Sequence, residues 1–338
     1  MNIHENISLK KLNTFGIDAS ARYYAGFSTI DEVCQILSES KFVNSRKLIL
    51  GGGSNLLFTK DFDGIVLKNN LKGIELVKED VDHYFVRSAG GEVWHELVMY
   101  CIANNYAGLE NLSLIPGNVG ASPMQNIGAY GAEIKDTFYE LEALHIQDKT
   151  IHKFNNAECK FGYRESVFKG ELKDQFIITS VTFKLYKKPI FNTSYGAIEK
   201  ELEVMGIKEL SIKSISDAVC AIRKSKLPNP AEIGNAGSFF KNPEVIRSKF
   251  EALKTEFSMI VGYDLENGNV KLAAGWLIEQ CGWKGQRFGD AGVHKLQALV
   301  LVNYGNANGS EILELSQKII ASVKEKFDVD LVREVNIV

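Results

Sequence analysis

The chain of 338 residues lacks the segments that mark secreted and membrane-spanning proteins. Residues 1–20 contain no apolar segment of signal-peptide length, and nowhere do about 18 apolar residues run together as a membrane span requires. The five cysteines are odd in number, widely spaced and without a C-x-x-C pair, so we predict buried thiols and no disulfide framework. We therefore expect a cytoplasmic protein with no membrane partner.

Histidine is scarce and the charges nearly balance. The six histidines show no metal-ligand spacing, because His95-Glu96 is followed by Met99 where an H-E-x-x-H motif needs its second histidine. We predict no protein-bound metal. The net charge of −3 offers no electrostatic case for a nucleic-acid partner. With 45% hydrophobic and 24% charged residues, the chain has the composition of a globular protein long enough for two or three domains.

A glycine-rich turn after a short apolar strand is the first candidate binding feature. Residues 47–50 (KLIL) predict a buried strand, and the glycines at 51–53 let backbone N–H groups approach an anion. A G-x-G-x-x-G dinucleotide fingerprint needs a glycine at position 56 followed by a helix, but Leu56 stands there and residues 56–68 predict another strand. The pattern indicates strand, phosphate-binding turn, strand, although a plain tight turn has the same pattern.

A second glycine-rich segment covers residues 108–131. Five glycines and two prolines alternate with Asn, Gln and Ser and with almost no charge. A disordered linker would be more polar, so the segment predicts a long, ordered, largely buried loop. Elsewhere strands and helices interleave without regular βαβ units, which favours an α+β fold.

The pattern of apolar residues and caps predicts the main elements. Helices are expected from a Thr29/Glu32 capping box, at 92–104, from Ser216 to before Pro228, after an Asn242-Pro243 N-cap, at 271–281 and at 310–327, and strands at 14–28, 74–77, 83–89, 139–147, 176–186, 234–241 and 331–338. Residues 187–214 are expected to form a surface excursion between two domains.

Four motifs together resemble the UDP-N-acetylenolpyruvoylglucosamine reductase family. They are GGGSN at 51–55, SLIPGNVGASPMQNIGAYG at 113–131, FGYRESVFK at 161–169 and GNAGSFFKNP at 234–243. The resemblance runs through almost the whole chain, and the segment around Tyr195 resembles the longer of the family's two types, whose tyrosine-bearing loop closes over the nucleotide.

The resemblance implies an α+β chain with an FAD-binding fold of the vanillyl-alcohol-oxidase (PCMH) type in two subdomains and an α/β substrate-binding domain. The expected divisions are 1–69 for the first FAD-binding subdomain, to which a C-terminal strand at 328–338 returns at the active site, 70–214 for the second, and 215–327 for the substrate-binding domain.

The implied activity is the NADPH-dependent reduction of UDP-N-acetylenolpyruvoylglucosamine to UDP-N-acetylmuramate in peptidoglycan precursor synthesis. The cofactor is FAD, bound without a covalent link, and the partner is a small sugar nucleotide; a monomer is expected. The two glycine-rich segments are implied to contact the FAD at Leu50, Gly51, Gly52, Gly53, Ser54, Asn55, Ile115, Pro116, Gly117, Gly120, Ala121, Gln125, Asn126, Gly128, Ala129 and Tyr130.

Hydride delivery to an enolpyruvyl ether requires a cation that stabilises the enolate and a proton donor. The resemblance implies Arg164 as the cation, Ser238 as the proton donor and Glu334 as a third catalytic residue beside Arg164. Simpler interpretations exist from the residues alone. An arginine among aromatics is usually stacked or ion-paired, a serine after a glycine turn can satisfy a backbone group, and a carboxylate on a terminal strand can face solvent.

The resemblance implies that the sugar nucleotide is bound by Tyr163, Tyr195, Lys226, Asn242 and Gln297. A cation at position 226 could instead complement a helix dipole, and Asn242 could cap a helix. Two other functions remain open from the sequence. One is an FAD-dependent sugar or alcohol oxidase of the same fold, and the other is a non-catalytic nucleotide-sugar binding protein.

Overall fold

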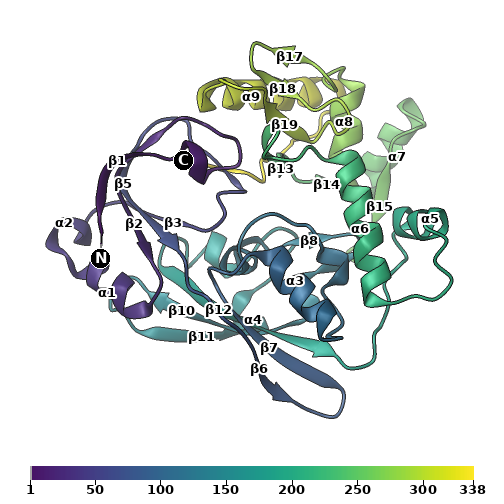
Figure 1. The fold of residues 1–338 in the computed structure, drawn as a ribbon. Coiled ribbons are helices and arrows are strands. Elements are labelled where there is room, and N and C mark those ends of the chain that lie inside the picture. The colour runs from purple at the N-terminus through teal and green to yellow at the C-terminus, as the bar shows by residue number, and fades with distance from the viewer. Residues whose placement is uncertain (1) are drawn as a thin grey trace. The chain divides into compact units, whose positions relative to one another are not determined.

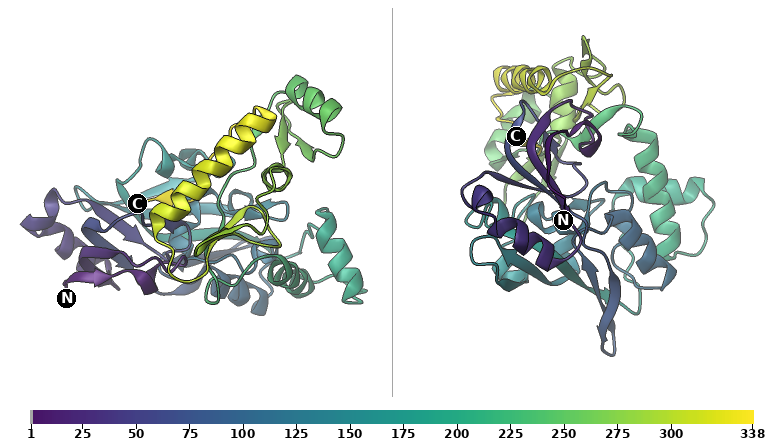
Figure 2. Two further views of the ribbon diagram at one scale, coloured as in Figure 1. Left: turned by 90° about the horizontal axis from the view of Figure 1, so that it is seen from above. Right: turned by 60° about the vertical axis from the view of Figure 1, so that its left-hand side comes forward.

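The computed structural model describes residues 2–338, which form two compact units (Figures 1 and 2). The first unit contains the residues up to Ile7 together with Ala21–Gly52 and Asp63–Ser225, and the second contains Ser8–Ser20, Gly53–Phe62 and Lys226–Val338. The chain therefore passes between the units several times, and one passage divides the glycine-rich turn between Gly52 and Gly53.

The first sheet of unit 1 carries the glycine-rich turn. Its strand order is β1 (His4–Ser8), β2 (Ser20–Phe27), β5 (Phe62–Asn69) and β3 (Lys47–Leu50). Helices α1 (Ile30–Ser38) and α2 (Ser40–Val43) contribute Val33, Ile36 and Phe42 to the hydrophobic core that this sheet shares. The predicted capping box is confirmed: the Thr29 hydroxyl accepts the Glu32 N–H at 3.2 Å, and the Glu32 carboxylate accepts the Thr29 N–H at 3.2 Å.

The chain after the glycine-rich turn is extended, as the sequence predicts. It forms β4 (Leu56–Leu57) and then β5, which pairs in parallel with β3 in a register that sets Lys47 opposite Ile65. The strand-turn-strand prediction is confirmed. A buried apolar run continues in β5 through Ile65, Val66 and Leu67, which suits a strand covered on both faces.

The second sheet of unit 1 is antiparallel. Its order is β11 (Ile151–Asn155), β10 (Phe138–His145), β12 (Phe176–Tyr186), β7 (His83–Ala89) and β6 (Ile74–Glu79). Helix α3 (Trp94–Ala103) packs on it through Trp94, Leu97 and Cys101, and the Trp94 ring meets Phe183 edge-on with centroids 5.7 Å apart. This helix lies within the range predicted for it, and it borders the second glycine-rich segment.

The second glycine-rich segment is ordered by short elements, as predicted. They are η2 (Glu110–Leu112), η3 (Val119–Ala121), η4 (Pro123–Gln125), the β8 (Gly128–Ala129) and β9 (Ala132–Glu133) pair, and η5 (Ile134–Asp136). Helix α4 (Asn156–Cys159) and η6 (Val167–Lys169) flank it. Glu110 and Asn126 are buried within it, and Asn126 donates from Nδ2 to Glu133 at 3.0 Å. A loop with satisfied buried polar groups stays in place without regular structure.

Two helices complete unit 1. They are α5 (Gly196–Val204) and α6 (Ile212–Lys226), which pack together through Ile198, Leu202, Ile215, Val219 and Ile222. The sequence predicted that the second helix begins at Ser216, but it begins a turn earlier. The Ser211 hydroxyl accepts the Ser214 N–H at 3.0 Å, so Ser211 rather than Ser216 caps this helix.

Unit 2 contains two small sheets and the longest helix. The sheets have the orders β13 (Gly234–Ser238), β19 (Val300–Asn303), β18 (Ala291–Val293), β17 (Arg287–Phe288), and β14 (Glu244–Val245), β16 (Val270–Leu272), β15 (Gly262–Asp264). The other elements are η1 (Lys10–Leu12), α7 (Arg247–Glu256), α8 (Ala274–Gln280), α9 (Gly309–Phe327) and β20 (Asn336–Ile337), which pairs in parallel with β4. Helix α9, the long yellow helix of Figure 2, buries Ile312, Leu315 and Ile319 on one face as its spacing predicts.

Three local predictions are wrong. The Asn242-Pro243 pair does not open a helix, because β14 intervenes and α7 begins at Arg247. The strand predicted at 331–338 is regular only over Asn336–Ile337, although Arg333 forms an isolated bridge with Phe240. The thiols are not all buried, since Cys34, Cys220 and Cys281 are half-buried. The first two misses concern residues whose partners lie far away in the sequence.

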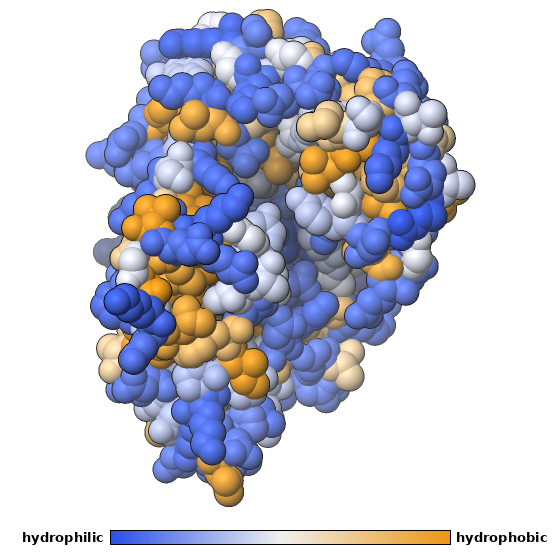
Figure 3. Space-filling view, turned by 90° about the vertical axis from the view of Figure 1, so that its right-hand side faces the viewer, coloured by the Kyte–Doolittle hydropathy of each residue, from blue (hydrophilic) through white to orange (hydrophobic). Residues whose placement is uncertain are grey.

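The described surface is mixed in character. Figure 3 shows one face on which hydrophobic groups are separated by hydrophilic side chains. Exposed large hydrophobic residues are spread over many elements, among them Val43, Val81 and Met259. Over residues 2–338, no helix combines the length and the apolar character needed to cross a bilayer.

Candidate active site

In unit 1 the two glycine-rich segments meet. A Cβ atom placed on Gly52 would lie 2.8 Å from Gly117 Cα, and one on Gly51 would lie 3.3 Å from the Asn118 Cβ. Only glycine allows the backbones to approach so closely. The sequence predicted both segments as cofactor-binding, and the fold brings Gly51, Gly52 and Gly117 together.

Side chains around this contact hold the turn in place. Lys68 on β5 donates from Nζ to the Gly51 carbonyl, and burial lowers the pKa of the Lys68 ammonium. Asn118 donates from Nδ2 to the Gly91 carbonyl at 2.7 Å. Neither residue was among the sequence-predicted site residues. Two signals in the sequence could have indicated them. Lys68 is a polar residue on a buried strand, and Asn118 is an asparagine inside the glycine-rich motif.

The arrangement suits the dinucleotide part of FAD. A pyrophosphate needs backbone N–H donors that approach it closely, and glycine-rich turns without side chains meet that need. Ile115, Pro116, Gly120, Ala121 and Gln125 lie on the same loop, in or beside η3 and η4. These residues therefore fit the cofactor.

Arg164 is fixed against the end of the second glycine-rich segment. Its backbone has φ +56°, in the left-handed region that is uncommon for arginine. From there Nη2 donates to the Gly128 carbonyl at 2.6 Å, Nη1 lies 4.0 Å from a Glu133 carboxylate oxygen, and the guanidinium lies 5.2 Å from the centre of the Tyr163 ring. The residues alone favoured stacking or an ion pair for Arg164, and the structure has a ring contact with Tyr163 and a carboxylate neighbour in Glu133.

The motif around Arg164 is tied to the loop at two further points. Asn126 has φ +43° and donates from Nδ2 to the Gly162 carbonyl at 3.0 Å. Ser166 donates from Oγ to the Met124 carbonyl at 2.7 Å. These contacts join residues 162–166 to the glycine-rich loop, so the orientation of Arg164 depends on the loop that is expected to hold the cofactor.

Tyr130 and Tyr195 meet in the same unit. Their rings pack edge-on with centroids 5.4 Å apart, Tyr130 has φ +50°, and Tyr195 is 44% exposed just before α5. Burial raises the pKa of the Tyr130 hydroxyl, and Arg223 on α6 opposes that rise. Arg223 was noted in the sequence only as part of the last turn of a helix, and its closeness to Tyr130 was not predicted.

Unit 2 brings Ser238 and Glu334 onto neighbouring chain segments. The Glu334 N–H donates to the Phe239 carbonyl at 2.8 Å, and the Lys241 N–H donates to the Val332 carbonyl at 2.8 Å. Residues 239–241 and 332–334 thus run side by side. The Asn55 amide donates to the Glu334 carbonyl at 3.3 Å from the other side. Ser238 and Glu334 are both half-buried.

The backbone around Ser238 is irregular. Gly237 has φ +70°, and the pairing of β13 with β19 shifts register between Asn235 and Ser238. The buried Asn235 side chain accepts the Gly237 N–H at 2.9 Å and donates to the Pro228 and Ile233 carbonyls. A bulge of this kind re-aims the side chain that follows it. Phe239 and Phe240, which follow Ser238, are buried and anchor the chain on that side of the serine.

The remaining predicted substrate residues lie in unit 2. Lys226 is exposed and is the last residue of α6. Asn242 accepts the Ala274 N–H on Oδ1 at 3.0 Å, so it caps α8 across the fold rather than the helix that follows it in sequence. Gln297 accepts the Leu299 N–H on Oε1 at 3.3 Å, which leaves its amide group as a donor.

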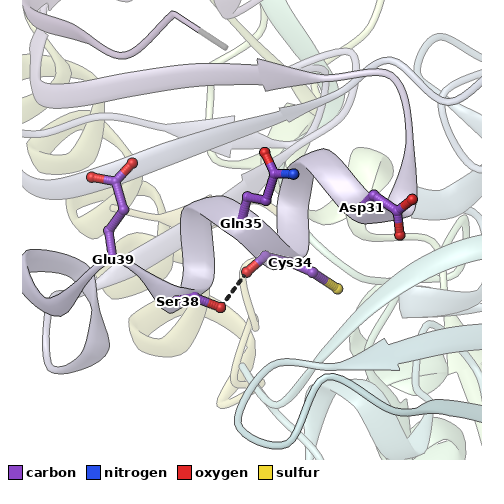
Figure 4. Close-up of a pocket in the computed structure, with 5 residues that line it drawn as sticks. All are labelled: Asp31, Cys34, Gln35, Ser38 and Glu39. Carbon is purple, nitrogen blue, oxygen red and sulfur yellow. Dashed lines mark hydrogen bonds between the residues drawn. The ribbon is translucent and has the colours of Figure 1, made fainter.

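Two other features lie outside this site. A shallow surface hollow of about 530 Å³ is lined only by residues of α1 and its C-cap, namely Asp31, Cys34, Gln35, Ser38 and Glu39 (Figure 4). Burial, followed by Asp31, raises the pKa of Cys34, so this thiol is a poor nucleophile. One group of potential metal ligands among the described residues, His145, Asp148 and His152, lies at the β10–β11 turn, where the Thr150 hydroxyl already joins Asp148 to His152.

Known proteins resemble the chain over its full length. Residues 21–155 match a family profile described as an FAD binding domain, and residues 229–338 match the C-terminal domain of UDP-N-acetylenolpyruvoylglucosamine reductase. Enzymes of that name from Flavobacterium johnsoniae and Amoebophilus asiaticus are 55% and 53% identical, over 100% of both chains in each case. The chain belongs to the UDP-N-acetylenolpyruvoylglucosamine reductase family.

A solved reductase of this family, MurB from Thermus caldophilus, has the same fold. It superposes with a TM-score of 0.70 at 24% identity, covering 100% of this chain and 99% of that one. The expected FAD-binding fold with a separate reductase domain is confirmed. The reductase is a UDP-N-acetylmuramate dehydrogenase, a flavoprotein that uses FAD and NADPH in peptidoglycan precursor synthesis.

Proposed function

We propose that Arg164, Ser238 and Glu334 carry the chemistry of this reductase on its enolpyruvyl sugar nucleotide. FAD, when bound, accepts a hydride from NADPH and supplies it to the enolpyruvyl CH2 group. Arg164 stabilises the negative charge that develops beside the substrate carboxylate. Ser238 delivers a proton to the neighbouring carbon, and Glu334 acts as the third catalytic residue.

One observation carries the proposal most directly. The Glu334 N–H reaches the Phe239 carbonyl at 2.8 Å, so a residue near the C-terminus lies one position away from the side chain proposed as proton donor. A serine hydroxyl is a weak acid, and it needs nearby cations and a dry site in order to donate. The buried phenylalanines that follow Ser238 keep water from one side.

We assign different residues to the cofactor and to the substrate. We place the FAD pyrophosphate against Gly52, Gly53, Ser54 and Asn55, and the flavin ring near residues 115–127. Gly53 has φ +65°, and a Cβ there would collide with the Leu12 carbonyl oxygen, which supports a tight turn without side chains. Tyr163, Tyr195, Lys226, Asn242 and Gln297 are assigned to the sugar nucleotide.

We also propose the type of reductase, its domain boundaries, its oligomeric state and its location. The reductase is of the longer type, because Tyr195 stands exposed before α5 on an excursion that leaves the second sheet. We propose that its three domains are residues 1–69 with 328–338, residues 70–214 and residues 215–327. We also propose that it acts as a monomer in the cytoplasm.

A spectrum of the purified protein tests the cofactor assignment. We expect a yellow protein that releases its flavin into the supernatant on acid precipitation, because the described glycine-rich segments, residues 51–55 and 113–131, contain no histidine or cysteine for a covalent link. Adding NADPH should bleach the flavin absorbance, and the enolpyruvyl sugar nucleotide should restore it. Flavin retained in the pellet, or recovery in air as fast as with the sugar nucleotide, would contradict the assignment.

Lys226→Ala is expected to raise KM for the sugar nucleotide more than it lowers kcat. A charged contact made equally in the ground and transition states contributes to binding only. A hydrogen bond to a charged group contributes about 1.5 to 3 kcal/mol, so KM should rise roughly tenfold to a hundredfold. Steady-state kinetics with varied sugar nucleotide measure this.

The matched control is Lys213→Ala, which removes an exposed lysine from the same helix where it pairs with Asp217 at 2.6 Å. Its KM should stay at the wild-type value. An unchanged KM for Lys226→Ala would contradict the substrate contact and would indicate that Lys226 only complements the dipole at the end of its helix.

A further inference from the structure

Leu114 holds a strained position at the entrance to the second glycine-rich segment. Its φ is +59°, in the left-handed region that a bulky residue rarely adopts. Such a conformation persists only where the surroundings enforce it, and it is often found at ligand sites. Leu114 directly precedes Ile115, Pro116 and Gly117, which we place against the flavin.

Both backbone groups of Leu114 are held by side chains from different helices. Its N–H donates to His95 Nδ1 at 3.0 Å, and its carbonyl accepts from Arg223 Nε at 3.2 Å. His95 lies on α3 and Arg223 on α6. A side chain of α3 therefore holds the N–H group of Leu114, and a side chain of α6 holds its carbonyl group.

The residues just before Leu114 are held by the same two helices. Trp94 on α3 donates from Nε1 to the Leu112 carbonyl at 2.8 Å. The Ser113 and Ser216 hydroxyls lie 2.7 Å apart, and Ser216 belongs to α6. Residues 112–114 thus bridge α3 and α6, whereas Ile115–Gly117 continue toward Gly52.

The contact with His95 requires a neutral imidazole. Nδ1 can accept an N–H only when it carries no proton, which places the ring proton on Nε2. Burial lowers the pKa of His95 below its ordinary value, and Lys224 and Arg223 on α6 lower it further, while Glu96 on α3 opposes them. His95 is therefore neutral near pH 7 and accepts the Leu114 N–H.

We propose that His95 and Arg223 are positioning residues that hold Leu114 in its left-handed conformation and so preset Ile115–Gly117 to receive the flavin. This inference rests on the proposed placement of the flavin against that segment. Arg223 also interacts with Tyr130, a second left-handed residue of the same loop, so one guanidinium steadies the loop at two places.

We call the two contacts of His95 and Arg223 with Leu114 the clamp. Its strength depends on pH. Protonated His95 has no lone pair on Nδ1 and faces the Leu114 N–H as a second donor. As the pH falls below 6.5 and through the lowered pKa of His95, the contact is lost and the affinity for FAD falls. Above that range the affinity does not depend on His95 protonation.

Two substitutions at His95 test the clamp. His95→Leu removes the acceptor, and we expect the Kd for FAD to rise about tenfold at pH 8, or 1.4 kcal/mol. His95→Asn keeps an acceptor oxygen near the position of Nδ1 and cannot titrate. Its Kd should stay within about threefold of wild type at pH 8 and should lack the weakening that wild type shows as the pH falls below 6.5. Flavin fluorescence on titration of the apoprotein measures each Kd.

Met99→Asn is the matched control, because it places asparagine at an exposed site of the same helix. It should keep wild-type affinity and pH dependence. Hydrogen exchange of residues 112–118 in the flavin-free protein adds a readout that activity does not supply, and exchange should be faster in His95→Leu than in His95→Asn.

The outcomes separate the clamp from the proposed function. Equal Kd values for wild type and His95→Leu, or the same loss of affinity at low pH in wild type and His95→Asn, would overturn the clamp. A wild-type protein that binds no FAD or does not reduce the enolpyruvyl sugar nucleotide would instead overturn the proposed function.

Discussion

Ser238→Ala is expected to leave reduction of the flavin by NADPH near the wild-type rate and to abolish most of its reoxidation by the enolpyruvyl sugar nucleotide. No substrate proton moves in the first half-reaction, whereas the second requires a proton at the substrate carbon. General acid catalysis contributes roughly 10²- to 10⁴-fold, which is about 3 to 5 kcal/mol of barrier. Rapid-mixing absorbance measurements of each half-reaction separate the two steps.

Two further variants sharpen that experiment. Ser238→Cys restores an acidic group and should recover part of the lost rate. Ser322→Ala is the control for a serine with a structural role, since the Ser322 hydroxyl accepts from Trp283 Nε1 at 2.6 Å. That variant should lose stability without a selective effect on either half-reaction.

The competing interpretation of Ser238 is that it only secures the Gly237 turn. That interpretation predicts loss of flavin or of folded protein, together with both half-reactions. An alanine variant whose flavin is reoxidised by the substrate at the wild-type rate would end the proton-donor proposal.

Arg164→Lys is expected to be nearly as damaging as Arg164→Ala. Arg164 already donates from one nitrogen to the Gly128 carbonyl at 2.6 Å, and its planar guanidinium directs further N–H groups elsewhere. A lysine ammonium lacks this fixed fork, so it cannot hold the Gly128 contact and meet a substrate carboxylate in the same geometry. Removing a donor that stabilises developing charge costs about 10²- to 10³-fold in kcat.

Steady-state kcat and the rate of flavin reoxidation by substrate measure the Arg164 effect. The control is Arg87→Lys, because Arg87 pairs with Glu75 at 2.6 Å on the exposed edge of the second sheet. Surface pairs contribute little, so its kinetics should be unchanged. Near wild-type turnover by Arg164→Lys would refute the geometric argument and leave Arg164 as a general positive charge.

Local features of this protein could be predicted from its sequence. The Thr29/Glu32 capping box, the extended chain after Gly53 and the buried stripe of α9 depend on residues a few positions apart. The ordered character of the second glycine-rich loop followed from its composition, and the family followed from four motifs. Local hydrogen bonds and periodic burial carry this information, so no tertiary contact is needed to see it.

Contacts between distant segments were decided only by the tertiary structure. The sequence did not indicate that Asn242 caps α8, that Glu133 faces Arg164, that the Glu334 backbone pairs with Phe239, or that His95 and Arg223 hold Leu114. Each joins a side chain or peptide group to a partner that many residues could have supplied. Such pairings depend on how whole sheets and helices pack, because only packing determines which unsatisfied donor lies within reach of which acceptor.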